Sequence, residues 1–349
     1  MTAADRAAAL PGALLPWFRE NARELPWRAD RAPYHVWLSE IMLQQTRVEA
    51  VRGYYARFLA ALPDIRSLAE APPDLLMKLW EGLGYYSRVR NLQAAARCVM
   101  AEHGGVFPSD YAAIRALPGI GDYTAGAIAS ICFEQPTPAV DGNVLRVWTR
   151  LNLDDRPPAS PALRRDVREA LAAVYPAGQC GAFTQSLMEL GATVCVPNGA
   201  PDCARCPCAD VCLSRNGAWR DYPVRAEKKP RRREARTLLL LRCGERIAVE
   251  KRPPHGLLAG LWQLPNAEGH LAPEDAVRTA ADWGAEPADL LRERRHTHIF
   301  THIEWDMVCY ELRCRAESPR FRWASPAELE TDVALPTAFR WAVGERNSE

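Results

Sequence analysis

The chain has 349 residues, of which 48% are hydrophobic and 25% are charged, and its formal net charge is +1. This composition is ordinary for a soluble globular protein, and the length favours two domains over one. A charge this close to zero excludes nucleic-acid binding through overall charge, so that any such binding must come from local sites. No apolar run reaches membrane-spanning length, and prolines interrupt the N-terminal run. We therefore expect a cytoplasmic protein without a membrane partner.

Residues 1–220 carry a helical pattern. Apolar residues recur at spacings of three and four, which is the period of one helix face. Glycine- and proline-rich breaks separate the repeats. The pattern predicts helices within 34–61, 74–101, 124–133, 143–151 and 162–175.

In the first of these helices, Glu40 shares a face with Val36, Trp37, Leu43 and Gln44. A carboxyl group among such neighbours is desolvated, which should raise its pKa. A Glu of raised pKa opposite an ionised Asp is the division of labour that breaks glycosidic bonds. The alternative is a buried Glu that bonds the backbone or Gln44.

Residues 117–121, Leu-Pro-Gly-Ile-Gly, predict a tight hairpin between two helices. The glycines permit positive φ and close approach of another backbone. The N–H groups that open the next helix lack partners within it and suit a phosphate oxygen. Such a contact positions a duplex without reading its sequence. Gly119 and Gly121 are thus candidate phosphate contacts, although an ordinary helix–helix turn explains them equally well.

Asp141 precedes the next predicted helix, where Asp is a preferred N-cap residue. We expect the helix dipole and the cap hydrogen bonds to keep this carboxylate ionised. An ionised carboxylate held in place can stabilise an oxocarbenium ion, so the capping role and a catalytic role are compatible.

Four cysteines, separated by seven, two and five residues, lie in a loop rich in proline and glycine. Four thiolates so close in sequence can hold either zinc or a 4Fe–4S cluster. Only one CxxC pair is present, which favours iron–sulfur, while unrelated buried thiols remain the alternative. Cys208, inside the last interval, is expected to be a bystander, and Arg205 could reach a phosphate. The predicted ligands are Cys195, Cys203, Cys206 and Cys212.

Beyond Tyr222 the sequence becomes basic and rich in proline, which predicts a linker. The period then changes to that of strands, which we expect at Thr237–Arg242, Arg246–Lys251 and Ile303–Arg313. The C-terminal third is therefore expected to be a smaller mixed α/β domain.

Six motifs in order resemble adenine DNA glycosylases of the MutY family, which belong with endonuclease III to the helix-hairpin-helix superfamily. They are LPWR (25–28), WLSEIMLQQT (37–46), GLGYYSR (82–88), LPGIGDYTAGA (117–127), VDGNV (140–144) and the cysteine loop. The resemblance implies an all-α helix-hairpin-helix glycosylase domain with a 4Fe–4S loop (1–226), a basic linker (227–236) and a smaller α+β, Nudix-like domain that recognises 8-oxoguanine (237–349).

The implied activity is base excision repair by a monofunctional hydrolase. Such an enzyme removes adenine opposite 8-oxoguanine or guanine from duplex DNA, after flipping the base into a pocket. We expect a monomer associated with the nucleoid, and the sequence identifies no protein partner.

The cysteine loop departs from the family pattern because its first interval is one residue longer. This difference affects the shape of the loop and the expected phosphate contact of Arg205.

The resemblance also assigns roles to single residues. Glu40 matches the general acid that protonates adenine at N7 and then helps deliver water, and Asp141 matches the residue that stabilises or captures the sugar cation. Tyr85 matches a wedge inserted into the base stack beside 8-oxoguanine. The matching adenine-pocket positions are Arg23, Leu25, Trp27, Arg28, Gln185 and Met188, and the matching neighbours of the lesion are Gln45, Thr46 and Leu83.

Tyr123 separates this activity from that of an endonuclease III-like enzyme, which acts on oxidised pyrimidines. Superfamily members that also cut the backbone carry a lysine at this hairpin position, whose amine forms a Schiff base. No lysine occurs in residues 117–143, and a phenol cannot form an imine. A catalytically idle DNA-damage sensor is opposed by the presence of both Glu40 and Asp141.

The C-terminal third resembles a Nudix-type domain that lacks the glutamate-rich helix of the hydrolases. Residues 266–285 hold Glu268, Glu274 and Asp275 but nothing like REXXEE. This predicts binding without hydrolysis and opposes a Nudix pyrophosphatase with a helical appendage.

Residues 295–302 resemble the family loop that inspects 8-oxoguanine, with threonine in place of serine, so the hydroxyl is retained. A histidine-rich hairpin without a ligand is the alternative. The predicted contacts are Phe300, Thr301 and His302.

Overall fold

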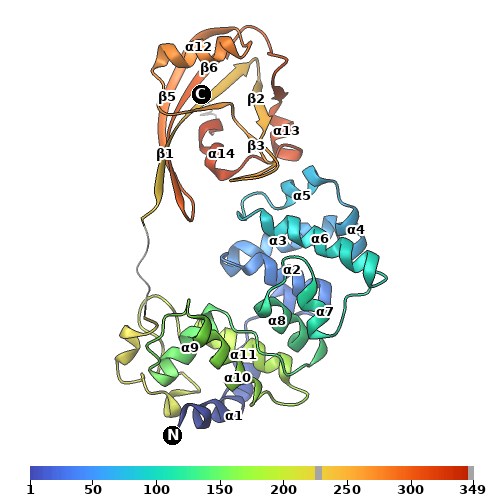
Figure 1. The fold of residues 1–349 in the computed structure, drawn as a ribbon, viewed down its shortest axis with the longest axis vertical. Coiled ribbons are helices and arrows are strands. Elements are labelled where there is room, and N and C mark those ends of the chain that lie inside the picture. The colour runs from blue at the N-terminus through green and yellow to red at the C-terminus, as the bar shows by residue number, and fades with distance from the viewer. Residues whose placement is uncertain (225–229, 345–349) are drawn as a thin grey trace. The chain divides into compact units, whose positions relative to one another are not determined.

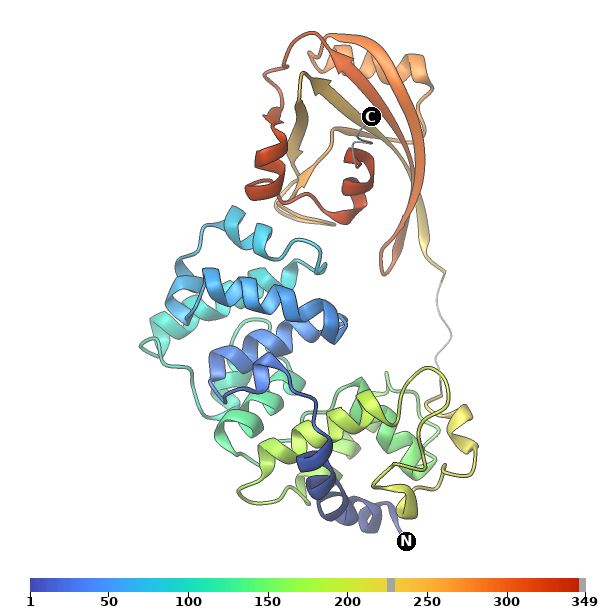
Figure 2. The same cartoon turned by 180° about the vertical axis from the view of Figure 1, so that it is seen from behind.

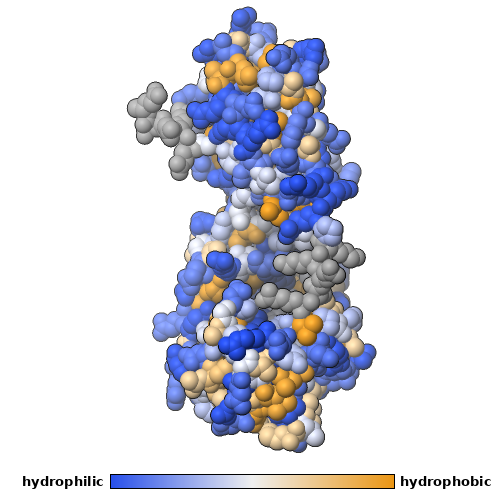
Figure 3. Space-filling model, turned by 90° about the vertical axis from the view of Figure 1, so that its left-hand side faces the viewer, coloured by the Kyte–Doolittle hydropathy of each residue, from blue (hydrophilic) through white to orange (hydrophobic). Residues whose placement is uncertain are grey.

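The computed structural model describes residues 1–224 and 230–344, which form two units (Figures 1 and 2). The first unit contains residues 1–70 and 87–224, and the second contains residues 71–86 and 230–344. In the described residues, no helix is long and apolar enough to cross a membrane. On the face drawn in Figure 3, hydrophilic side chains cover most of the surface, with scattered hydrophobic patches between them.

The first unit is helical. Its α-helices are α1 (Ala3–Asn21), α2 (Pro33–Leu43), α3 (Val48–Ala61), α4 (Ile65–Glu70), α6 (Ser87–Glu102), α7 (Tyr111–Ala116), α8 (Asp122–Phe133), α9 (Gly142–Asn152), α10 (Pro161–Ala172) and α11 (Cys180–Thr193). The expected helical stretches are confirmed, although turns divide 34–61 and 74–101 into separate helices. Helices α1, α4, α7 and α11 were not predicted.

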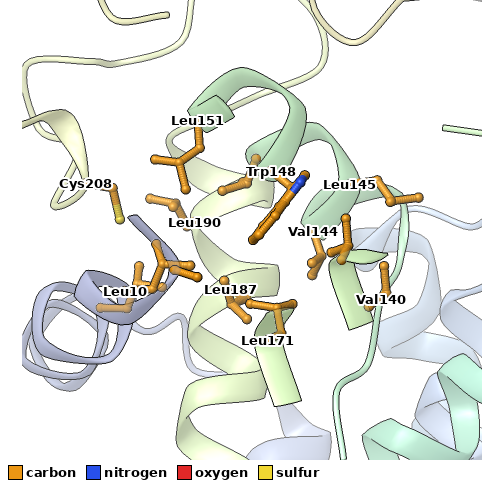
Figure 4. Close-up of a cluster of buried hydrophobic side chains, with 14 of the residues drawn as sticks. Leu10, Val140, Val144, Leu145, Trp148, Leu151, Leu171, Leu187, Leu190 and Cys208 are labelled. Carbon is orange, nitrogen blue, oxygen red and sulfur yellow. The ribbon is translucent and has the colours of Figure 1, made fainter. Parts of the chain in front are cut away.

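A buried apolar cluster joins α1, α9, α10 and α11 (Figure 4). Helix α9 presents Val144, Trp148 and Leu151 to this cluster, and α11 presents Leu187 and Leu190. Burying apolar side chains of this size contributes about 1.5–3 kcal/mol each. This packing fixes α9 and α11 against one another, and both helices bear residues of the site described below.

The second unit is built on a mixed sheet with the order β3-β2-β1-β6-β5. Strands β1 and β6 run parallel, whereas β5 and β6 form an antiparallel hairpin. Two further short strands, β4 and β7, pair with β1 and β2. The strands are β1 (Arg232–Cys243), β2 (Arg246–Lys251), β3 (Trp262–Gln263), β4 (Asn266–Glu268), β5 (Pro287–Ile299), β6 (Ile303–Cys314) and β7 (Arg322–Ala324).

Each face of this sheet packs on its own apolar cluster, as alternation along a strand requires. Leu239 and Leu241 of β1 face α12 (Pro273–Asp282). Leu238 and Leu240 face the opposite side, where α14 (Thr337–Val343) contributes Phe339. Figure 1 shows α12 and α14 on opposite sides of the strands. The remaining helices of this unit are α5 (Pro73–Leu79) and α13 (Pro326–Thr331).

Strand β1 begins at Arg232, earlier than the predicted Thr237, because it continues to pair with β6 as far as Arg232 opposite Ile303. Part of the predicted linker at 227–236 is therefore strand, while residues 225–229 lie outside the described residues. Strands β2 and β6 lie where they were predicted, and β1 and β2 are joined at Gly244-Glu245.

Candidate active site

A cavity of about 700 Å³ opens into the first unit between α2, α8, α9 and α11. Its wall contains both carboxylates that the sequence indicated, together with the hairpin tyrosine and the residues expected to contact adenine. The predicted residues that line it are Arg23, Leu25, Trp27, Arg28, Glu40, Gln45, Thr46, Tyr123, Asp141, Gln185 and Met188.

Glu40 lies on α2 with only 6% of its surface exposed. The phenol of Tyr123, from the first turn of α8, donates a hydrogen bond of 2.5 Å to its Oε2. Burial raises the pKa of Glu40, the Tyr123 bond lowers it, and the negative charge of Asp141 raises it again, so that the pKa is about 7. The predicted burial of Glu40 is confirmed. Its hydrogen-bond partner is a phenol, in place of the backbone or Gln44 partner of the alternative interpretation.

Tyr123 has no charge to contribute at neutral pH. Burial, followed by the charges of Glu40 and Asp141, raises its pKa well above the ordinary value. The phenol therefore keeps its proton and acts as a donor toward Glu40. Its oxygen also lies 4.0 Å from the sulfur of Met188 on α11.

Asp141 is the N-cap of α9, as predicted, and accepts hydrogen bonds of 2.7 Å from the Val144 amide and from the Asn143 side chain. The expectation about its charge was incomplete. Burial raises its pKa more than these bonds and the charge of Arg146 lower it, and the net shift is upward. The cap bonds still favour the ionised form, but they act against the desolvation of a crowded pocket.

Glu189 was missed by the sequence reasoning. It is fully buried on α11, where Arg23 donates to it through Nε (2.7 Å) and Nη2 (3.0 Å), and Arg28 donates through Nη2 (2.7 Å). Burial opposes its ionisation, but the two arginines lower its pKa overall. A glutamate inside the apolar run SLMELG, beside the predicted Met188, was the signal that could have revealed it.

Arg146 was also not predicted. It donates to the side chain of Asn143 (2.8 Å) and to the backbone carbonyls of Gly191 (2.7 Å) and Cys195 (2.8 Å). The same close packing is seen at Gly191, where an added Cβ would lie 2.6 Å from that of Asn143. Arg146 therefore ties the turn that carries Asp141 to the start of the cysteine loop.

The predicted hairpin connects α7 to α8, and its two glycines have different backbone conformations. Gly119 has φ +74°, in the region that favours glycine, and an added Cβ would lie 2.5 Å from that of Asn91. Gly121 is the N-cap of α8 and has an extended backbone (φ −95°), so it does not use the positive φ that glycine permits. Neither glycine lines the cavity.

The residues expected to contact 8-oxoguanine are divided between the units. Gln45 and Thr46 line the cavity of the first unit, whereas Leu83, Tyr85, Phe300, Thr301 and His302 belong to the second. Within the second unit, Thr301 and His302 form the turn between β5 and β6, and the Tyr85 hydroxyl lies 2.8 Å from Oγ1 of Thr301. Residues 295–299 are strand and not loop.

The four predicted ligand cysteines line one small cavity, together with Cys208. Arg150 donates to Sγ of Cys195 at 3.4 Å, and Figure 4 shows Cys208 at the edge of the apolar cluster. The four predicted ligands thus share one cavity with a fifth thiol, and four thiolates are the usual donor set of an iron–sulfur cluster. As placed in the described ranges, however, no three His, Cys, Asp or Glu side chains could hold a metal ion.

Comparison with known families gives two matches. Residues 38–173 match the HhH-GPD superfamily of base excision DNA repair proteins, and residues 236–343 match the NUDIX domain. The chain is 33% identical to human adenine DNA glycosylase over 399 aligned positions, which cover 95% of this chain and 73% of the human protein.

Solved structures resemble the helical part. A thermostable thymine-DNA glycosylase superposes with a TM-score of 0.53 at 26% identity, covering 61% of this chain and 97% of its own. A non-covalent endonuclease III–DNA complex gives the same TM-score at 22% identity, with coverage of 63% and 100%. The second likeness shows the fold alone. With the similarity to the human enzyme along nearly the whole chain, these findings show that the chain belongs to the family of adenine DNA glycosylases.

Proposed function

We propose that this protein removes adenine from duplex DNA by hydrolysing its N-glycosidic bond, and that it acts on adenine opposite 8-oxoguanine or guanine in base excision repair. The observation that carries the proposal is Glu40, a buried carboxyl with a pKa of about 7, beside Asp141 in one cavity. Family membership supports adenine as the base.

Glu40 acts as the general acid. A carboxyl with a pKa near 7 is partly protonated at neutral pH and can still give up its proton, which is the balance that general acid catalysis needs. The proton passes to N7 of adenine and makes the base a better leaving group. Tyr123 orients the carboxyl through its 2.5 Å hydrogen bond, and the deprotonated Glu40 then helps to deliver water.

Asp141 stabilises the sugar cation that forms as the bond breaks. Its two cap hydrogen bonds hold the carboxylate in place, so that it needs no rearrangement when charge develops. Glu189 holds Arg23 and Arg28 at the wall of the cavity, where their guanidinium groups can contact the extruded base. Arg23, Leu25, Trp27, Arg28, Gln185 and Met188 form this base pocket.

The proposed reaction stops at base removal. Tyr123 occupies the position at which an enzyme that also cuts the DNA backbone would need an amine. Its hydroxyl group donates its hydrogen bond to Glu40. A phenol cannot form an imine with C1′. The endonuclease III-like alternative is therefore disfavoured at the same residue that supports the acid role of Glu40.

DNA binding is proposed to use the hairpin and the second unit. The first amides of α8, behind Gly119 and Gly121, would hold a phosphate. Gln45, Thr46, Leu83 and Tyr85 would lie beside the lesion, and Phe300, Thr301 and His302 would contact it.

Cys195, Cys203, Cys206 and Cys212 would hold a 4Fe–4S cluster, which when bound would brace the loop that Arg146 joins to the active site. A monomer associated with the nucleoid is proposed.

The test is single-turnover cleavage of duplexes that carry adenine opposite 8-oxoguanine, adenine opposite guanine, or thymine glycol. We expect the unaltered protein to release adenine from the first two, without nicking the strand until base or heat is added. Glu40→Gln should lower this rate by at least about a hundredfold, whereas Glu70→Gln, a surface carboxylate 3.8 Å from Arg66, should not. Unchanged cleavage by Glu40→Gln would refute the role of Glu40.

A further inference from the structure

We infer that Glu81 is a positioning residue that sets Tyr85 against Thr301, and that it thereby determines how strongly the enzyme prefers adenine opposite 8-oxoguanine over adenine opposite guanine. This inference rests on the proposed function. It concerns a buried ionic network within the second unit, for which the excision chemistry has no use.

Glu81 follows α5, and only 8% of its side chain is exposed. Its Oε1 accepts hydrogen bonds from the Leu335 amide (2.8 Å) and from Nε of Arg340 (2.9 Å), and Nη2 of Arg340 forms an ion pair with the same oxygen at 2.8 Å. Its Oε2 accepts from Lys78 (2.7 Å). One carboxylate is thus engaged by two cations and a backbone amide, the arrangement in which buried charge is best satisfied.

Lys78 extends this grip. Its ammonium group also donates to the carbonyl of Leu329 at 2.7 Å and lies 3.4 Å from that of Val333. Leu329 belongs to α13, and Arg340 belongs to α14. The α5 segment is therefore held to both C-terminal helices through Glu81 and its lysine neighbour.

From α14, a chain of aromatic contacts leads to the β5–β6 turn. Phe339, next to Arg340, packs on Trp305 with ring centroids 5.9 Å apart, and Trp305 packs on Phe300 at 4.9 Å. Phe300 immediately precedes Thr301, so the turn that presents the Thr301 hydroxyl is fixed to the same helix that Glu81 grips.

The hydrogen bond between Tyr85 and Thr301 completes a closed circuit of contacts, which runs from Glu81 through α14 and the β5–β6 turn back to the segment that carries Glu81. Tyr85 lies four residues beyond Glu81, after a turn in which Gly82 (φ +97°) and Gly84 (φ +68°) take left-handed conformations. The indole of Trp80 donates to the Gly84 carbonyl at 3.1 Å. Tyr85 itself has φ +47° and remains 47% exposed, so its ring is presented outward from a braced turn.

The positions of Tyr85 and Thr301 in this circuit of contacts explain why Glu81 should affect specificity. Tyr85 and Thr301 are exposed side chains whose relative position depends on the frame behind them. A wedge and a hydroxyl that read one lesion must keep a fixed spacing, because small displacements weaken directional hydrogen bonds steeply. Loss of the Glu81 charge loosens one side of that frame without touching either reading group.

The test compares single-turnover excision of adenine opposite 8-oxoguanine with excision opposite guanine. In Glu81→Gln we expect the ratio of the two rates to fall by about five- to tenfold, roughly the worth of one or two well-placed hydrogen bonds. The matched control is Asp74→Asn on the same segment, whose exposed ion pair with Lys251 spans 2.9 Å. Such exposed pairs contribute little, so its ratio should stay that of the unaltered protein.

A double-mutant cycle separates positioning from general damage. If Glu81 acts through Tyr85, then Glu81→Gln should lower the ratio no further in a Tyr85→Phe background. If Glu81→Gln does not fold, Arg340→Gln breaks the same network from the other side and should give the same fall and the same cycle.

The outcomes are distinct. An unchanged ratio in folded Glu81→Gln, or a fall that is undiminished in the Tyr85→Phe background, overturns the inference alone. Failure of the unaltered protein to excise adenine from any duplex overturns the proposed function and, with it, this inference.

Discussion

The cavity around Glu40 and the surface around Thr301 handle polar groups in opposite ways. In the cavity, the carboxyl group of Glu40 is buried, and burial raises its pKa to about 7. At the β5–β6 turn, the polar groups are exposed and their positions come from the aromatic and ionic frame behind them. Proton transfer requires a group whose pKa is shifted toward the working pH. Recognition of a lesion requires hydrogen-bonding groups that are held at a fixed spacing.

This contrast also separates two kinds of buried charge. Among the residues that the structure describes, the phenol of Tyr123 is the only hydrogen-bond partner of the Glu40 side chain, and the proton of Glu40 remains available for chemistry. Glu189 is paired with two arginines, and its pKa is lowered overall although burial opposes this. The first arrangement suits a proton donor, and the second suits a scaffold that fixes the cations of the cavity wall.

The largest expected effect on stability tests the scaffold role of Glu189. Glu189→Gln leaves Arg23 and Arg28 without a counter-charge in the cavity wall, which should lower the free energy of unfolding by about 2–4 kcal/mol. Glu70→Gln, which removes an exposed partner of Arg66, should cost less than about 1 kcal/mol. Urea denaturation measures both. Equal losses would remove the distinction between the buried network and a surface pair.

The smallest expected effect lies at the exposed surface. Thr301→Val removes the hydroxyl that lies 2.8 Å from Tyr85 but keeps the branched shape of the side chain. We expect the preference for 8-oxoguanine over guanine to fall by about threefold to tenfold, with little change in the unfolding midpoint. Single-turnover rates on the two duplexes check this. A loss of stability comparable with that of Glu189→Gln would show that Thr301 is part of the frame and not of the reading surface.

Much of the geometry of the candidate site could be predicted because it depends on local sequence. Asp141 caps a helix that begins at the next residue, and the apolar face around Glu40 indicates burial without any tertiary contact. The repeat of apolar residues likewise gave most helices of the first unit, and alternation gave β2 and β6.

The parts that were missed depend on contacts between residues distant in sequence. Glu189 meets arginines more than 160 positions away, and nothing local in SLMELG specifies that partner. The bond from Tyr123 to Glu40 links α8 to α2 in the same way. The upward shift of the Asp141 pKa reflects crowding by the whole pocket, which a capping motif cannot reveal. The early start of β1 at Arg232 follows from its pairing with β6.

The most direct test of the central claim is the pH dependence of single-turnover adenine excision. The proton donor must be protonated, and the pKa of Glu40 is about 7, so the rate should fall by about tenfold per pH unit above that pKa. In Glu40→Gln the remaining slow reaction should show no such inflection. A rate in the unaltered protein that stays level or rises between about pH 7 and 9 would contradict the assignment of Glu40 as the acid.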